Sequence, residues 1–156
     1  MKKLLLICCA ITMIFSLFGC KDVSPEGKYS MNGSVALGAV DNNSLDKTKV
    51  TYNVMIGATK QDIENIVTQE PLINPEYDDF LLENGPHNVE IKDIETKNPY
   101  LEISGSFVFD TKNKTKEEID AMNLFQGIKL VDQNKEEFVL KFNYNTLETQ
   151  TGRGAE

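Results

Sequence analysis

Carboxylates are the side chains of this chain most able to do chemistry, because it holds 24 Asp and Glu residues but one histidine and three cysteines. Two short acidic segments offer several side-chain oxygens each, the donor type that Ca²⁺ prefers. Their residues are Asp41, Asn43 and Asp46 in the first segment and Glu76, Asp78 and Asp79 in the second. The first segment lacks the glycine and final glutamate of a calcium-binding loop, and the second is an acidic cluster beside Pro75. We therefore expect two solvated loops, with no metal site and no cofactor.

Residue types for nucleophilic catalysis and for zinc binding are scarce. The only histidine, His87, follows a Gly-Pro pair and is expected in an exposed turn. Ser104 and Ser106 lie in an alternating segment, so we expect them on the polar face of a strand rather than in a nucleophile elbow. A zinc site needs several Cys or His ligands, which this sequence does not offer. We expect no enzymatic activity, although two acids that meet in the fold would leave a carboxylate pair for hydrolysis of an envelope polymer.

The first residues have the pattern of a secretory signal. Lys2 and Lys3 give a basic start, and an apolar run follows from Leu4 to Phe18. This run is shorter than the roughly 20 apolar residues that a membrane-spanning helix needs. It matches the basic, apolar and small-residue regions of a cleaved signal, although an uncleaved anchor is the alternative. Cys8 and Cys9 lie inside the run and are expected to act only as small apolar residues.

The end of the apolar run, Leu17-Phe18-Gly19-Cys20, resembles the lipobox of bacterial lipoproteins. The resemblance implies that a diacylglyceryl group is attached to the Cys20 sulfur and that the signal, residues 1–19, is cut between Gly19 and Cys20. Phe18 departs from the motif, which usually has a small residue at that position. Two acyl chains are enough for stable anchoring, whereas one chain binds only marginally. The implied location is the outer face of the cell membrane, in a bacterium of the Gram-positive type.

Cleavage at Cys20 would leave an acidic mature chain. The whole chain has a formal charge of −8, and loss of Lys2 and Lys3 would bring it to −10. We expect no nucleic-acid partner, because phosphates are met by Lys and Arg. Attachment to the membrane is expected through the covalent lipid alone, since an acidic domain is not drawn to anionic lipid. With Cys20 as its only cysteine, the mature chain must rely on an apolar core rather than on disulfides.

Composition and periodicity divide the mature chain into three parts. Residues 20–28 are polar and are expected to form a lipidated tether. Residues 146–156 have almost no apolar content and are expected to be a disordered tail. Between them, residues 29–145 show period-two segments separated by turn residues, which predict strands. The strands are expected near 29–37, 50–56, 89–94, 101–109, 128–130 and 138–144, with 101–109 central in its sheet and a loop of about four residues before 138.

Two short helices and two breaks complete the prediction. Thr59 with Asp62 and Thr115 with Glu118 fit the helix-start box, and predict helices near 60–68 and from 115 onward. A strand is the alternative for 65–69. We expect a loop over 71–79 because it holds two prolines, and a break at 84–86 because Asn-Gly-Pro is a strong turn signal.

This order of elements favours an antiparallel β-sandwich, a mainly β fold with one or two short helices. The segment Leu124–Asp132 and the strands around it resemble immunoglobulin-like domains of small lipoproteins from Gram-positive bacteria, most of which have no known activity. We therefore expect a non-catalytic module that binds an envelope or surface protein. The alternatives are a small lipoprotein that binds a solute or calcium, and a hydrolase of an envelope polymer that uses a carboxylate pair.

Overall fold

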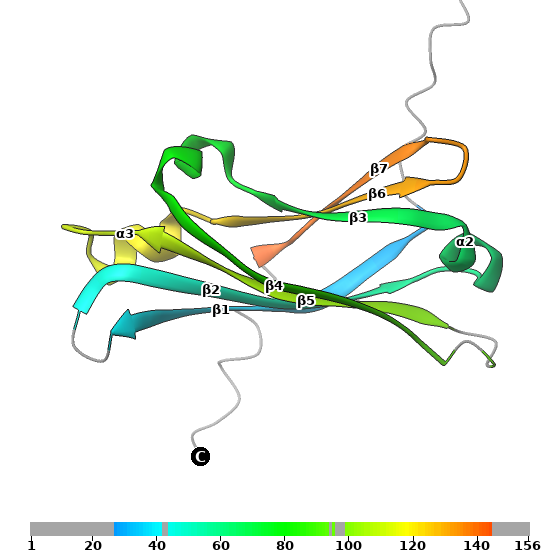
Figure 1. Cartoon of the computed structure of the whole chain (residues 1–156), viewed down its shortest axis with the longest axis horizontal. Helices are drawn as coiled ribbons and strands as arrows, with labels where there is room; N and C mark the ends of the chain where they lie inside the picture. The colour runs from blue at the N-terminus through cyan, green and yellow to red at the C-terminus, as the bar shows by residue number, and fades with distance from the viewer. Residues whose placement is uncertain (1–26, 42–43, 94, 96–98, 145–156) are drawn as a thin grey trace, which may run out of the picture.

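The computed structural model describes residues 27–41, 44–93, 95 and 99–144. Its strands form two antiparallel β-sheets (Figure 1). The first sheet has, in spatial order, β1 (Ser30–Asp41), β2 (Ser44–Gly57), β5 (Tyr100–Asp110) and β4 (Leu81–Lys92). The second has β3 (Ile66–Ile73), β6 (Phe125–Asp132) and β7 (Glu137–Lys141). This strand order is that of the seven-stranded immunoglobulin constant-type domain. The predicted immunoglobulin-like sandwich is confirmed.

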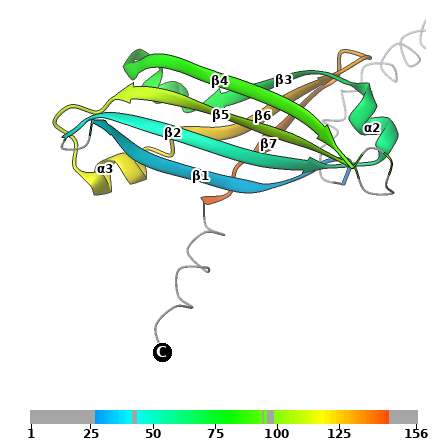
Figure 2. The same cartoon turned by 60° about the horizontal axis from the view of Figure 1, so that its bottom comes forward.

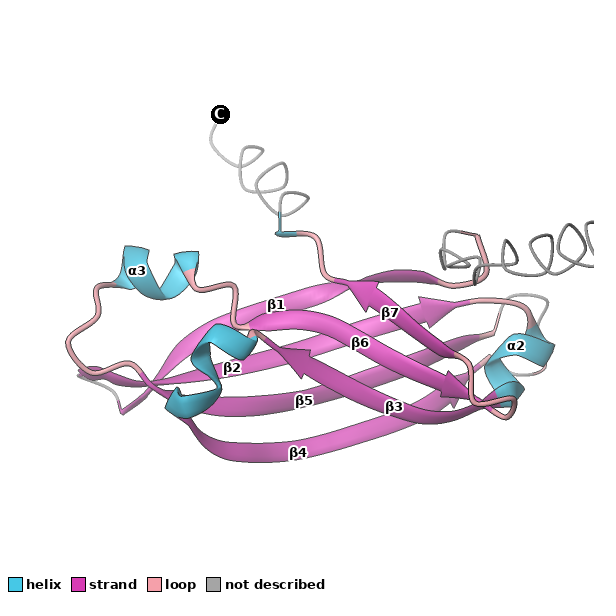
Figure 3. Cartoon of the chain, turned by 90° about the horizontal axis from the view of Figure 1, so that it is seen from above, coloured by secondary structure: helices cyan, strands magenta, loops and turns pink. Residues whose placement is uncertain are grey.

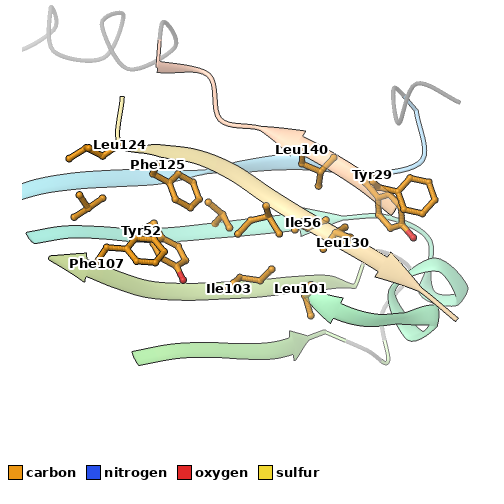
Figure 4. Close-up of a cluster of buried hydrophobic side chains, with 14 of the residues drawn as sticks. Tyr29, Tyr52, Ile56, Leu101, Ile103, Phe107, Leu124, Phe125, Leu130 and Leu140 are labelled. Carbon is orange, nitrogen blue, oxygen red and sulfur yellow. The ribbon is translucent and has the colours of Figure 1, made fainter. Parts of the chain in front are cut away.

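The core lies between the two sheets and follows from the period-two pattern of the central strands. In β2, the residues Val50, Tyr52, Val54 and Ile56 are buried and alternate with exposed neighbours. The β5 strand lies between β2 and β4, so its predicted central position is confirmed (Figure 2). The β6 strand covers these side chains from the other sheet (Figure 4). Each fully buried aliphatic or phenyl side chain contributes roughly 1.5–3 kcal/mol relative to exposure.

Two short helices lie at opposite ends of the sandwich (Figure 3). Helix α2 (Lys60–Asn65) is capped at its N-terminus by Thr59, and helix α3 (Lys116–Ala121) is capped by Thr115, as predicted. At Thr115 the helix-start box is complete, because its hydroxyl accepts from the Glu118 N–H and the Glu118 carboxylate accepts from the Thr115 N–H. Each helix is joined to the core by one buried isoleucine on its inner side. None of the helices in the described part has the length and apolar content that crossing a membrane takes.

The predicted helix over 60–68 is too long, and the alternative of a strand near 65–69 is the correct one. Helix α2 ends at Asn65, and β3 begins at Ile66 and continues through Pro71 to Ile73. The predicted loop therefore begins only after Ile73, where Pro75–Phe80 forms a 3₁₀ turn. Pro71 is tolerated because β3 is an edge strand that pairs only with β6, so its missing N–H costs no ladder bond on the open side.

The predicted break at Asn84-Gly85-Pro86 is also wrong. These residues lie inside β4, which continues from Leu81 to Lys92. The register of β4 against β5 shifts between Asn84 and His87, so the turn signal produces an irregularity within the strand instead of ending it. Gly85 is needed there, because a Cβ at this position would overlap the Ser106 side chain of β5. As in β3, the proline is accommodated in an edge strand.

Ile103 and Val89 provide a matched test of the core, because they are partners across the β5–β4 ladder. Ile103 is fully buried, whereas Val89 in the edge strand is 39% exposed. We expect Ile103→Ala to lower the free energy of unfolding by about 2–5 kcal/mol, through lost burial and the cavity left behind. Val89→Ala should cost less than about 1 kcal/mol. Urea titration measures both values, and equal costs would contradict this placement of the core.

Candidate functional site

The two acidic segments do not form a metal-binding cluster in the described part of the chain. Asp41 ends β1, and Asp46 lies in β2, where its carbonyl accepts from the Thr111 N–H at 2.9 Å. Glu76, Asp78 and Asp79 lie on the 3₁₀ turn and are exposed. Asn43, Gly19, Cys20 and the tail 146–156 are outside the described residues. Among the residues that are described, no group of three or more His, Cys, Asp or Glu is placed to hold a metal ion.

His87 lies in β4 rather than in the predicted turn, and it forms a hydrogen bond with Tyr52. The distance between His87 Nδ1 and the Tyr52 hydroxyl is 2.9 Å. Tyr52 in β2, Gly105 in β5 and His87 in β4 occupy one row across the sheet. A Cβ at Gly105 would overlap the Tyr52 hydroxyl. The missing side chain of Gly105 therefore lets the tyrosine reach over β5 to the histidine.

The environment of this pair favours a structural role. The Tyr52 ring is 1% exposed and stacks on Phe107 and on Phe125, with ring centroids 5.5 and 4.7 Å away. Burial raises the pKa of the Tyr52 hydroxyl to about 12, so it stays protonated at neutral pH. A protonated phenol inside the core does not offer a free nucleophile. Ser104 and Ser106 alternate with the inward-facing residues of β5, on the opposite face as predicted.

A cluster of charges fixes the start of the domain. Lys28 Nζ lies 3.6 Å from an Asp62 oxygen and 3.8 Å from an Asp132 oxygen, and its distances to the ring centroids of Tyr29 and Phe138 are 5.3 and 4.6 Å. The Asp132 side chain is 2% exposed, and its other oxygen accepts two backbone N–H groups of the β6–β7 turn, at 2.8 and 2.9 Å. We call this set the Lys28 clasp. It ties the N-terminal segment to α2 and to the second sheet.

The Lys28 clasp also brings two carboxylates together. Asp62 and Asp132 share one lysine, as do the cross-strand partners Glu90 and Glu102, which share Lys92. Lys28 contacts both carboxylates and offsets one of their two charges, and Asp132 also accepts from backbone N–H groups. A general acid and a general base for glycoside cleavage need carboxylates that face a common cleft. The geometry of this pair is that of a structural ion-pair network.

A hollow of about 480 Å³ lies beside the clasp. It is lined by residues 27–30, 57–59, Pro99 and Tyr100. Its volume falls within the roughly 300–1,000 Å³ of small-molecule sites. This hollow is the feature that the solute-binding alternative would require. A second hollow, of about 90 Å³, lies at the other end between β1, β2 and α3, and its apolar lining includes Leu37, Leu45 and Ile119.

The edges of the two sheets differ in how they are protected. Edge strands expose unpaired backbone groups, and proteins usually block them with charges, proline, bulges or short length. Three of the four edge strands carry such features: Glu70 and Pro71 in β3, Glu83, Pro86, Glu90 and Lys92 in β4, and Glu137 and Lys141 in β7, which has only five residues. The fourth, β1, has neither a charged residue nor a proline from Ser30 to Val40.

No known protein family, curated protein or solved structure matches this chain. The assignment of function therefore rests on its own residues and on its fold.

Gly105→Ala should destabilise the sheet by roughly 1–3 kcal/mol, because the added methyl displaces the buried Tyr52 side chain. The matched control is Gly38→Ala in β1, where an added Cβ meets nothing within 4 Å. That change should be neutral or slightly stabilising, since alanine loses less backbone entropy on folding. Thermal denaturation of the two variants compares them directly. Similar melting temperatures would contradict the crossing of Tyr52 over Gly105.

The raised pKa of Tyr52 predicts a loss of stability at alkaline pH. Its ordinary value is 10.0, and burial raises it to about 12 in the folded chain. The folded state therefore holds this proton more tightly, so the associated stability is complete below about pH 10 and is lost as the pH rises to about 12. Tyr52→Phe should weaken this dependence. Tyr29 and Tyr144, whose pKa values are also raised by burial, should keep part of it.

The free energy of unfolding is measured for the wild-type chain and for Tyr52→Phe between about pH 9 and pH 12, the range over which the shifted pKa of Tyr52 affects stability. The Tyr52→Phe variant lacks the hydrogen bond to His87 at every pH. Only the slope of its free energy of unfolding against pH therefore tests the prediction. Identical slopes would show that the Tyr52 phenol ionises as readily in the folded chain as in the unfolded one.

Proposed function

We propose that the protein is a lipoprotein held on the outer face of the cell membrane by a diacylglyceryl group on Cys20, and that its sandwich acts there as a non-catalytic interaction module. The observation that carries the proposal is the short distance along the chain between the lipobox and the folded domain. Lys28, which the clasp holds in place, follows Cys20 by eight residues. Eight extended residues reach roughly 27 Å.

The position of the Lys28 clasp supports an orientation for the domain. The clasp lies at the end of the sandwich with α2 and the β6–β7 turn, so this end is nearest to the anchor. The β2 strand of 14 residues spans roughly 46 Å. The opposite end, with α3 and the 3₁₀ turn, therefore extends beyond the reach of the tether. It faces away from the membrane, toward envelope or surface partners.

Binding without catalysis is supported by the state of the groups that catalysis would need. In the Tyr52–His87 pair, the buried Tyr52 hydroxyl stays protonated. In the Asp62–Asp132 pair, both carboxylates are held by Lys28, which offsets one of their two charges. The acidic charge of the chain keeps the domain from lying on anionic lipid. The anchor would thus hold the sandwich near the membrane while leaving its edges and its far end accessible.

Replacement of the anchoring sulfur tests the proposal. In cells that process lipoproteins, we expect the wild-type chain in the membrane fraction, with a mature amino terminus at Cys20 that carries two acyl chains. Cys20→Ser should abolish acylation, and the chain should stay uncleaved or appear in the medium. Cys9→Ser is the control, because this cysteine lies in the expected signal and should not affect anchoring. Mass spectrometry of the mature amino terminus is decisive. An unmodified thiol at Cys20, or an intact start at Met1, would refute the anchor.

A further inference from the structure

The free edge of β1 is regular as well as unprotected. From Ser30 to Ala39 each residue of β1 has a β2 partner in unbroken antiparallel register. The other side of this segment has no ladder partner among the described residues, because β1 ends the sheet (Figure 2). The irregularity in the register of β1 comes only between Ala39 and Asp41, at the end of the strand. The segment before it has no bulge, charge or proline, and such an unpaired segment is a template for another strand. The N–H and C=O groups of alternate residues point toward that open side.

The two faces of β1 can be assigned from its register against β2. Met31, Val35 and Leu37 lie opposite buried residues of β2, so they are on the inner face. Leu37 is nevertheless 37% exposed, and in the described part of the chain no further strand follows β1 on its open side. A strand added to β1 would extend the inner face over Leu37. The added strand therefore needs apolar residues on one face and small polar residues on the other.

The sequence of β1 meets this need when it is paired with itself. In antiparallel pairing, opposed residues point to the same face, so a two-fold axis at Val35 keeps inner residues opposite inner residues. In this register each large side chain on the inner face meets a small one, and the pairs on the outer face hold small or polar residues. The pairs are Leu37 with Gly33 and Met31 with Ala39 on the inner face, and Asn32 with Gly38 and Ser34 with Ala36 on the outer face.

We infer that β1 pairs with β1 of a second copy of this chain, antiparallel and about an axis at Val35, so that the four-stranded sheets of two copies become continuous. A two-fold contact of this kind is self-complementary and closed. Charge favours the strand as the contact. Two copies of a chain with formal charge −8 repel each other, yet Ser30 to Val40 brings no like charges together. Asp41 is placed opposite Tyr29 rather than opposite an acid.

Strand pairing alone buries little area compared with a stable interface of roughly 1,200–2,000 Å². Confinement of both copies to one membrane raises their effective concentration and favours a weak contact. This contribution rests on the proposed lipid anchor, whereas the pairing itself does not. In this register Ser30 lies opposite Val40, so the two copies of Ser30 are about 10 residues apart along the strands, roughly 34 Å. Tethers of roughly 27 Å allow both lipids to enter the same membrane when the two-fold axis is normal to it. The strands of the paired copies then run parallel to the membrane, so the orientation with the α3 end away from the membrane is that of a single copy.

Cysteine cross-linking in intact cells tests the pairing. Val35→Cys in the full chain places two thiols on the two-fold axis, where opposed Cα atoms about 4.5–5.5 Å apart permit a disulfide. We expect a covalent dimer on mild oxidation, seen by non-reducing electrophoresis. The wild-type chain, oxidised in the same way, shows whether Cys20 alone forms a disulfide. Val89→Cys, in the opposite edge strand of the same sheet and 39% exposed, is the matched control and should remain monomeric.

A second pair of substitutions distinguishes the effect of a charge on the edge strand from the effect of the same charge elsewhere on the sheet. Ala36→Lys, added to Val35→Cys, should abolish the dimer because it places a charge on the edge strand beside the axis. Thr51→Lys adds the same charge at the β2 partner of Ala36, which is exposed, and should leave the dimer intact.

The membrane fraction and the medium are assayed separately, so a released chain that still forms the dimer would refute the anchor and not the pairing. No dimer from Val35→Cys, an equal dimer from Val89→Cys, or a dimer that survives Ala36→Lys would each overturn the pairing.

Discussion

The apolar layer between the two sheets is the interaction on which the rest of the structure depends. The described residues contain no cysteine, so stacking and burial of side chains such as Tyr52 and Phe125 must supply the stability. A slip of one residue in a strand would turn all of its buried side chains toward solvent. The period-two pattern therefore excludes a one-residue slip of β2 against β5. The register of β2 against β5 in turn places the Tyr52–Gly105–His87 row and the inner face of β1.

Sequence alone predicts the elements whose local pattern agrees with their surroundings. The alternation in β5 and the helix-start box at Thr115 are complete within a few residues, and both are found as expected. Pro71 and Pro86 mislead for a physical reason. Proline is a break in a central strand but is tolerated in an edge strand, and whether a strand is central or at the edge depends on the whole topology. Local patterns do not contain that information.

The candidate functional residues likewise fall into those that the local sequence reveals and those that only the fold brings together. The proposed lipobox ending at Cys20 is contiguous, so the sequence suggests its chemistry without a fold. The bond between Tyr52 and His87 joins residues 35 positions apart and depends on a glycine in the strand between them. The Lys28 clasp likewise joins the start of the domain to Asp62 and Asp132. Long-range contacts of this kind follow from strand order, which periodicity does not specify. The missing charges in β1 are visible in the sequence, but they gain meaning only when β1 is known to be an edge.

The unbroken β1–β2 ladder has a mechanical consequence for a domain attached at its amino terminus. Tension from an anchor would enter at Lys28 and act along the axis of β1. Backbone hydrogen bonds between antiparallel strands run perpendicular to that axis. Under the proposed anchoring, a partner bound at the far end would oppose a pull toward the membrane. This force would load the β1–β2 ladder in shear. Many hydrogen bonds would then bear the force together instead of breaking one after another. The lifetime of the folded domain under load is governed by its unfolding rate.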